Sequence, residues 1–292
     1  MCRDNLCLGT VKLDNPNYGY SSSINKEPVN YKEFLENVIK IGINKFDTSP
    51  RYGNSESILG KAIDSNDSFI SSKIDNLKIN DPNSPKIMLT SVNNSLLNLR
   101  KDYLDICYLH QNEIQILSDP YIHEGLELLK DLNLIDKSGA SVYSFNECEY
   151  CINSEIFDCI QIPLNITDTS FFTNFIKNTN SSKLFVARSL LLQGILVNRD
   201  LIKTSIRSAE DIFVYLNKID SVAKKADLSV LELCLAFIFS LPDIDHYIIG
   251  STSINNLLHN IKCMGIILEP DIIDSIFELS EIKKNWSNPR NW

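Results

Sequence analysis

The sequence predicts a single-domain α/β protein with the (β/α)8 barrel fold. Eight short apolar runs alternate with longer segments whose apolar residues recur at helical spacing, as expected for parallel strands joined by crossover helices. The runs are rich in Ile, Leu, Val and Phe, which is typical of strands buried on both faces. The glycine-rich G-x-G-x-x-G turn of an open doubly wound sheet is absent after the early runs.

The eight runs define the expected strands in order. They are NLCLGT, INKFDT, FISSKI, LDICYLH, DKSGASV, FDCIQIPLN, KLFVARSL and HYIIGS. Helical periodicity is clear in segments such as 31–42 and 123–133, and Asn/Asp/Ser clusters read as loops. No Pro-, Gly- or Ser-rich linker interrupts the chain. We therefore expect one domain over 1–292, with a C-terminal tail at about 283–292 over or beside the barrel mouth.

Composition narrows the class of protein. The chain has 292 residues, 43% of them hydrophobic and 22% charged, with a net charge of −9. This charge and the lack of a basic block argue against a nucleic-acid partner. No apolar run is long enough to span a membrane, and the start does not resemble a signal peptide, so we expect a cytoplasmic protein. The eight cysteines are then expected to be reduced. Cys148 and Cys151 have metal-like spacing but no second pair, so we expect no metal.

Polar side chains gather where three successive strands should end. Asp47 follows INKF, Lys73 closes FISSK, His110 closes LDICYLH, and Tyr52 lies in the turn after Asp47. Each has a structural explanation on its own: a cap, a solvated strand end, a core histidine or a packed flank. Catalysis in a parallel barrel occurs at the carboxyl ends of the strands, so all four together indicate an active site.

The chemistry of these groups suits carbonyl reduction. Hydride attack on a carbonyl creates an alkoxide, which needs a proton and a positive field. The Tyr52 hydroxyl can donate this proton as the general acid. Lys73 is expected to lower its pKa, with Asp47 holding Lys73 in place. His110 can orient the carbonyl oxygen.

Several motifs resemble those of the aldo-keto reductase family. GINKFDTSPRYGNSESILGKAI is similar to the family's Asp–Tyr signature, and SLLNLRKDYLDICYLHQ to its helix–strand unit ending in histidine. LSVLELCLAFIFSLPDIDHYIIGSTSINNLLHNI resembles its last strand and cofactor-binding helix. The likeness runs from about Leu8 to Ile261. The motifs SVY and RSxxLQG are similar to those of one bacterial branch of the family. Some members of that branch resemble proteins found together with sugar-modifying pathways.

The resemblance implies site residues and a cofactor. It assigns Asp47, Tyr52, Lys73 and His110 as the catalytic tetrad, and NADP(H) as the cofactor, with NAD(H) as the second choice. It implies a cofactor site formed by Ser141 and Gln161 at the nicotinamide amide, Arg188 beside the ring, Ser189, Leu190, Gln193 and Gly194 in the pyrophosphate loop, and Gly250, Ser251, Thr252, Asn256 and Asn260 around the adenosine.

Three departures from the family pattern concern the cofactor. Val142 follows Ser141 where many members have Asn, and Arg188 stands where many have a stacking Tyr. A guanidinium plane can also stack on an aromatic ring. No Lys or Arg lies in GSTSINNLLHN, although a 2′-phosphate is usually bound by a basic residue, so Ser251, Ser253 and backbone groups would have to bind it.

The substrate is expected to be a small carbonyl compound, a sugar-like one included. Tyr18, Tyr20 and Gln111 are the expected substrate contacts, and whether the chain has a protein partner is unknown from the sequence. Two alternatives remain. One is a cofactor-binding regulatory or sensor protein with little turnover, suggested by the altered amide site and Arg188. The other is a sugar dehydrogenase that uses the same tetrad in the oxidative direction.

Overall fold

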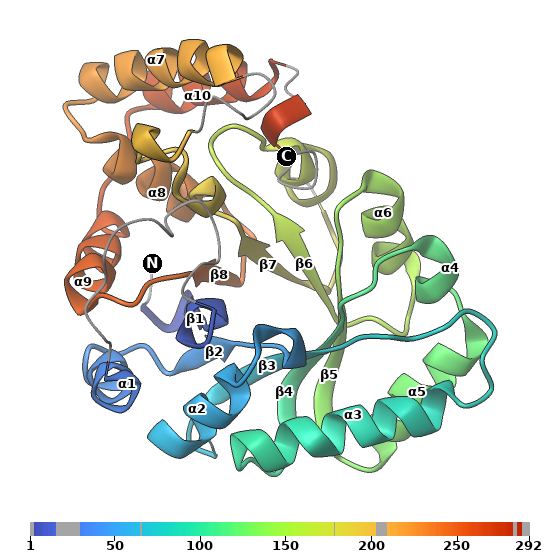
Figure 1. The fold of residues 1–292 in the computed structure, drawn as a ribbon. Coiled ribbons are helices and arrows are strands. Elements are labelled where there is room, and N and C mark those ends of the chain that lie inside the picture. The colour runs from blue at the N-terminus through green and yellow to red at the C-terminus, as the bar shows by residue number, and fades with distance from the viewer. Residues whose placement is uncertain are drawn as a thin grey trace.

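Eight parallel strands close into a barrel in strict chain order (Figure 1). The computed structural model describes residues 3–15, 30–64, 66–177, 179–202, 209–282 and 285–287. The strands are β1 Leu6–Gly9, β2 Lys45–Asp47, β3 Phe69–Ile74, β4 Leu104–Leu109, β5 Ile135–Ser141, β6 Cys159–Pro163, β7 Leu184–Arg188 and β8 His246–Ile249. The barrel closes where β1 pairs with β8, with Leu6 opposite Tyr247. The predicted fold class and all eight predicted strands are confirmed.

Helices surround the barrel on its outside (Figure 1). The α-helices of the described residues are α1 Tyr31–Lys40, α2 Ser55–Ala62, α3 Ser84–Leu99, α4 Ile114–Leu117, α5 Pro120–Asp131, α6 Phe145–Asn153, α7 Ala209–Lys225, α8 Val230–Ser240, α9 Ile254–Cys263 and α10 Pro270–Ser280. Short 3-10 turns occur at η1 Arg3–Asn5, η2 Val11–Leu13, η4 Pro50–Tyr52, η6 Leu192–Gly194, η7 Arg199–Leu201 and η8 Asn285–Ser287.

Local sequence explains where several helices begin. The Asn30 side chain accepts from the Glu33 amide at the start of α1, and Asp119 caps α5. Ser144 and Ser229 each form a capping box with a glutamate three residues later, at the start of α6 and α8. These caps satisfy backbone N–H groups that have no partner within the helix.

The connection between β6 and β7 departs from the regular unit. Its helical part in the described residues is the single π-helical turn η5 Phe172–Ile176. The segment is rich in Asn, Thr and Ser, whose side chains compete with helical hydrogen bonds. The Asn174 amide donates to the Ser170 carbonyl at 2.7 Å, as such competition predicts.

The amino end of the barrel interior is filled by apolar side chains. Ile106 and Tyr108, which alternate with the helix-facing Cys107 and Leu109, form a buried cluster with Cys159. Gly139 is required beside them, because a Cβ at this position would lie 2.5 Å from the Tyr108 ring. Lys45 and His246 also contact Phe69 at this end, whereas Asp47, Lys73 and His110 lie at the carboxyl ends of the strands, which form the mouth.

Some expectations fall on residues that the structure does not describe. Tyr18, Tyr20 and most of the 283–292 tail lie outside the described residues. Within the tail, Trp286 of η8 is buried and packs edge-on against Tyr215 of α7, with ring centroids 5.4 Å apart. In the described ranges, no helix has both the length and the apolar character to cross a membrane.

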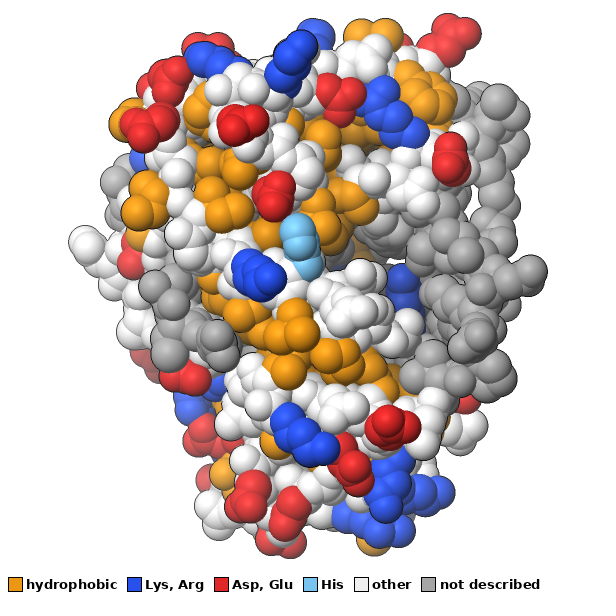
Figure 2. Space-filling view, turned by 90° about the vertical axis from the view of Figure 1, so that its left-hand side faces the viewer, with side chains coloured by type: hydrophobic (Ala, Val, Ile, Leu, Met, Phe, Trp, Pro, Cys, Tyr) orange, Lys and Arg blue, Asp and Glu red, His pale blue; other side chains and the backbone are white. Residues whose placement is uncertain are grey.

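The described residues contain no group of three or more His, Cys, Asp and Glu side chains that could hold a metal. Cys148 and Cys151 lie buried in α6, and burial raises the pKa of Cys148 to about 12. Figure 2 shows the face on the left-hand side of Figure 1. There, Lys and Arg side chains are interspersed with Asp and Glu rather than gathered into a basic patch.

Candidate active site

Asp47 and Lys73 form a buried ion pair at the barrel mouth. Asp47 ends β2 and Lys73 lies near the end of β3, and the Lys73 Nζ is 2.7 Å from Asp47 Oδ1. The same ammonium donates to the Thr48 carbonyl at 2.8 Å, and both side chains are nearly inaccessible. Burial is the largest single effect and lowers the pKa of Lys73, but Asp47 and Tyr52, through their charges and hydrogen bonds, together raise it above its ordinary value. Lys73 is therefore held as a cation.

Tyr52 is presented by the turn that follows β2. The Ser49 hydroxyl caps this turn at the Arg51 amide, and the Tyr52 amide donates to the Ser49 carbonyl at 2.9 Å. Lys73 Nζ lies 5.2 Å from the Tyr52 ring centroid. Burial raises the pKa of Tyr52 more than Lys73 lowers it, so the pKa lies above its ordinary value. The expected lowering by Lys73 is present, but burial and Asp47 exceed it.

His110 lies beside Tyr52 at the end of β4. The two rings meet edge to face with centroids 6.3 Å apart, and the His110 Nδ1 lies 3.4 Å from Ser49 Oγ. Burial, with the nearby cations Lys73, Arg51 and Arg188, lowers the pKa of His110 to about 4 against the opposing effect of Asp47. The imidazole is therefore neutral at pH 7. The structure brings all four predicted tetrad residues together.

A hydrogen-bonded chain connects this group to two residues predicted at the nicotinamide amide. Ser141 ends β5 opposite Gln161 of β6. The Ser141 hydroxyl donates to Gln161 Oε1 at 3.0 Å, and Gln161 Nε2 donates to Asp47 Oδ2 at 3.0 Å. Asp47 also accepts from the Ser71 hydroxyl at 3.0 Å. Ser141 and Gln161 are thus side by side at the mouth and bonded to each other.

Arg188, at the end of β7, extends the same chain. Its Nε donates to Ser141 Oγ at 3.2 Å, and its Nη2 donates to the Val142 carbonyl at 2.9 Å. Its guanidinium stacks on the Tyr143 ring, 3.9 Å from the centroid. Sequence reasoning missed Tyr143, although an aromatic residue two positions after Ser141 in the same strand-end turn was a signal for it.

The loop predicted to cover the pyrophosphate is tightly wound. Ser189, Leu192 and Gln193 have φ of 63°, 46° and 56°, and Gly194 has φ of 96°. Turn hydrogen bonds at 2.9 and 2.8 Å close it, while Leu190 and Leu192 anchor it in the core. Non-glycine residues in this left-handed region cost about 1–2 kcal/mol each, and such strain clusters at functional sites.

The residues predicted at the adenosine end lie around the start of α9. Ser253 caps the helix at the Asn256 amide, and Ser251 exchanges hydrogen bonds with Ser253. Gly250 precedes them in open space, since a Cβ there would meet nothing within 4 Å. Thr252 and Asn256 lie at the same junction, and Asn260 is buried further along α9. Lys262 lies in the last turn, at the far end of the helix.

Gln111 was predicted to contact substrate. Its Oε1 accepts from the Leu77 amide at 2.6 Å and its Nε2 donates to the Leu77 carbonyl at 3.0 Å. The side chain therefore joins the loop after β4 to the loop after β3 by two hydrogen bonds.

Sequence reasoning also missed Ser49, Arg51 and Asp75, which lie around His110.

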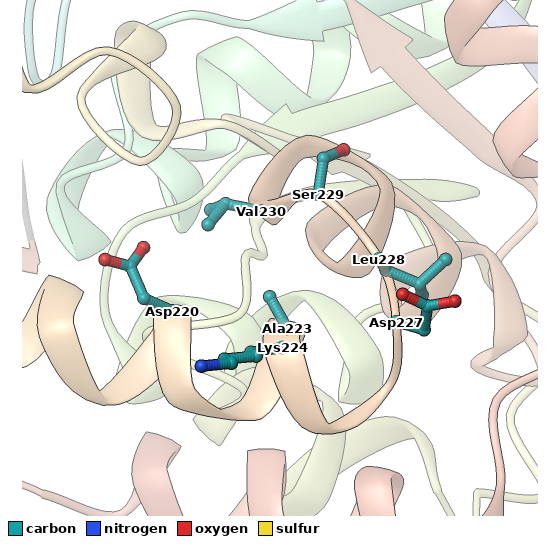
Figure 3. A pocket seen from close by; sticks show the side chains of 7 residues that line it. All are labelled: Asp220, Ala223, Lys224, Asp227, Leu228, Ser229 and Val230. Carbon is teal, nitrogen blue, oxygen red and sulfur yellow. The ribbon is translucent and has the colours of Figure 1, made fainter.

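Two hollows lie outside the mouth. One of about 500 Å³ lies between α7 and α8 (Figure 3) and is lined by Asp220, Ala223, Lys224, Asp227, Leu228, Ser229 and Val230. The other, of about 480 Å³, lies between α6 and η5. None of the predicted site residues lines either one.

The closed barrel with a Lys–Asp pair, Tyr and His at its mouth has the arrangement expected of one family of oxidoreductases. The model of the aldo/keto reductase family matches residues 5–281, and the chain belongs to that family.

Individual relatives agree with this assignment. The chain is similar to the uncharacterized oxidoreductase YqkF of Bacillus subtilis, with 27% identity over 276 residues, 87% of this chain and 89% of that protein. It is 33% identical to the D-arabinose 1-dehydrogenase of Saccharomyces cerevisiae over 140 residues, 41% of each chain. An aldo/keto reductase from Klebsiella pneumoniae, solved with NADP and acetate, has the same fold, with a TM-score of 0.71, 20% identity and coverage of 96% of this chain and 93% of that one.

Proposed function

We propose that the chain is a nicotinamide-dependent reductase that converts an aldehyde or ketone, a sugar-like one included, to an alcohol. The observation that carries this proposal is the buried Lys73–Asp47 pair, 2.7 Å apart, beside Tyr52 and neutral His110. We propose a small carbonyl compound as the partner rather than nucleic acid, given the net charge of −9.

The residues at the mouth suit a nicotinamide dinucleotide. Ser141 and Gln161 present a hydroxyl and an amide next to Asp47, and the stacked Arg188 offers a planar cation beside them. The strained loop after β7 and the capped start of α9 supply backbone N–H groups, which suit phosphate oxygens. Bound there, a reduced nicotinamide supplies the hydride.

Each catalytic side chain then has a defined task. The Tyr52 hydroxyl donates its proton to the oxygen that becomes an alkoxide, and Lys73 stabilises the resulting phenolate. Asp47 keeps Lys73 charged and in place. His110, neutral at pH 7, holds the carbonyl oxygen as a hydrogen-bond donor.

NADPH is the proposed cofactor, with NADH the second choice. The NADP bound to the Klebsiella relative supports the first. The first turn of α9 carries no basic side chain, which supports the second. At that position, the Ser251 hydroxyl and the start of α9 are the groups proposed to receive a 2′-phosphate.

The test follows NADPH and NADH absorbance with a reactive aromatic aldehyde, comparing the native chain with Tyr52→Phe. We expect oxidation by the native chain and a loss of at least about a hundredfold in the variant, the usual contribution of a general acid. Unchanged activity in Tyr52→Phe would exclude Tyr52 as the acid. Tight cofactor binding without turnover of any carbonyl would instead favour the sensor alternative.

The oxidative direction is the second candidate, and the name of the yeast relative favours it. The same Tyr52 would then accept a proton from a sugar hydroxyl. Initial rates with D-arabinose and NADP+ or NAD+, set against rates with the aldehyde, decide which direction the enzyme favours.

A further inference from the structure

Three side chains that the proposed mechanism does not use, Ser49, Arg51 and Asp75, form a small polar cluster around His110. Arg51 Nε forms an ion pair with Asp75 Oδ2, and the same Oδ2 lies 3.8 Å from His110 Nδ1. The Ser49 hydroxyl is closer, at 3.4 Å from His110 Nδ1. Arg51 contacts both neighbours of the ring, because its backbone amide donates to Ser49 Oγ at 3.2 Å.

The cluster affects which nitrogen of the His110 ring carries the proton, because Ser49 and Asp75 both face Nδ1. A neutral imidazole has one N–H and one acceptor nitrogen, and the neighbours of one nitrogen select the tautomer. A carboxylate can only accept, so a free Asp75 would favour the proton on Nδ1. A hydroxyl can donate, so Ser49 can leave Nδ1 as the acceptor and place the proton on Nε2.

Arg51 decides between these two neighbours. It engages the Asp75 oxygen that faces Nδ1, and its backbone amide occupies an acceptor position of Ser49 Oγ. The serine proton is then free to be donated to Nδ1. Within the described residues, His110 Nε2 has no hydrogen-bond partner, whereas Nδ1 faces Ser49 and Asp75.

We propose that Arg51 and Asp75 are positioning residues that set the tautomer of His110, so that Nε2 carries the proton donated to the substrate oxygen. The donation to substrate rests on the proposed function, whereas the tautomer itself does not. The burial of Asp75 fits this role. The Asp75 side chain is 6% exposed, beneath an Arg51 side chain that is 56% exposed. A carboxylate held in so enclosed a place affects its neighbours strongly.

The other charges around the ring do not select a tautomer. Lys73 and Arg188 disfavour the imidazolium, as Arg51 also does, and Asp47 favours it. Burial, which is the largest effect, and the three cations keep the ring neutral at pH 7, the condition under which the choice of tautomer matters. Among the described carboxylates, Asp75 is the one with an oxygen within 4 Å of a His110 ring nitrogen.

The test records the 15N shifts of the histidine rings by two-bond NMR correlation. The chain has four histidines, so assignment through a His110→Gln variant is direct. Spectra are taken at about pH 8, above the ordinary imidazole pKa of about 6.5. We compare the native chain with Arg51→Gln, Arg51→Lys and Arg51→Gln/Asp75→Asn. Lys32→Gln, which removes a cation from an exposed pair with Glu36, is the control.

We expect the native ring to carry its proton on Nε2. Arg51→Gln should move it to Nδ1 and lower kcat about tenfold or more, with little change in KM. The double variant should restore the Nε2 tautomer and recover most of the loss, since the competing carboxylate is gone. Arg51→Lys should stay close to native, and Lys32→Gln should change nothing.

An Nδ1 proton in the native ring, or an Nε2 proton that persists in Arg51→Gln, would overturn the proposal. A switch of tautomer in a chain that reduces no carbonyl would uphold the role of the pair and reject the proposed function. Thermal unfolding of each variant identifies any loss of fold, which the double variant should not show.

Discussion

Gln161 donates a 3.0 Å hydrogen bond to Asp47, a residue 114 positions earlier in the chain. The contact joins a residue predicted at the cofactor to one predicted at the proton donor. Gln161 also accepts a hydrogen bond from Ser141, which in turn accepts one from Arg188. One set of hydrogen bonds therefore spans the mouth from β7 to β2. A ligand that forms hydrogen bonds with the Ser141 or Gln161 side chain would therefore also change the hydrogen bonding of Asp47, which is the ion-pair partner of Lys73.

Replacing Asp47 should cost stability as well as activity. Asp47→Asn leaves Lys73 buried without a counter-ion, and breaking such a pair costs about 3–5 kcal/mol. The pKa of Lys73 should then fall, because Asp47 contributes the largest of the effects that raise it. Urea unfolding measures the loss. Glu36→Gln, which breaks the exposed pair with Lys32, is the control and should cost less than about 1 kcal/mol.

The pH dependence of this loss follows from the direction of the shift. The folded-state pKa of Lys73 is raised. The pair therefore stabilises the native chain fully below the unfolded pKa of about 10.4, and loses this effect as pH rises through the folded value. In Asp47→Asn the folded-state pKa of Lys73 should lie below the unfolded value, so the stability of the variant should rise with pH once pH passes that lowered pKa. Native stability should show no such rise between about pH 6 and 9, and a gap between the two chains that widens as pH rises would contradict the assignment.

The reduction rate should be nearly independent of pH across the physiological range. His110, with its pKa lowered to about 4, stays neutral above that pH. Tyr52, with its pKa raised, keeps its proton into the alkaline range. We expect kcat/KM to be flat from about pH 5.5 to about pH 9. A break near the ordinary histidine value of about 6.5 would show that His110 is not desolvated as described.

Tyr143 should support cofactor binding through Arg188. The guanidinium stacks 3.9 Å from its ring centroid, and a contact of this kind is worth about 0.5–1 kcal/mol. Tyr143→Ala should weaken NADPH binding about two- to fivefold, while Tyr143→Phe keeps the ring and most of the affinity. Fluorescence titration measures both dissociation constants. Equal losses in the two variants would assign the effect to the hydroxyl instead.

Gly139 should tolerate no side chain. A Cβ would lie 2.5 Å from the Tyr108 ring and 2.9 Å from the Cys159 carbonyl, inside a filled barrel. Gly139→Ala should cost about 1–3 kcal/mol, the usual effect of overpacking. Gly250→Ala is the matched control: its Cβ would meet nothing within 4 Å, so it should stay within about 0.5 kcal/mol. Urea unfolding of both variants tests the difference.

The sequence predicted the barrel well because buried parallel strands appear as continuous apolar runs. It predicted that Asp47, Tyr52, Lys73 and His110 would meet, because the carboxyl ends of neighbouring strands share one face. The π-helical turn η5 in place of a regular helix was not expected. It follows from side-chain competition at Asn174, which periodicity does not measure.

Side-chain pairing at the mouth was the part that the sequence did not predict. The bond between Ser141 and Gln161 depends on the register of β5 with β6, and that of Gln111 with Leu77 depends on how two loops meet. The direction of the Tyr52 pKa shift could not be predicted either, because it is a balance between burial, the cations Lys73 and Arg188, and the anion Asp47. Such balances are set by distances that no motif encodes.

The pairing of Leu6 with Tyr247 has a consequence for how the chain folds. The first and last strands are neighbours, so the seam between them cannot form until almost the whole chain has left the ribosome. Contacts of such high sequence separation form slowly. Until β8 arrives, β1 and β7 each present an unpaired edge on which another chain can add a strand. A truncation before His246 removes β8 and leaves both edges unpaired, so aggregation is its expected consequence.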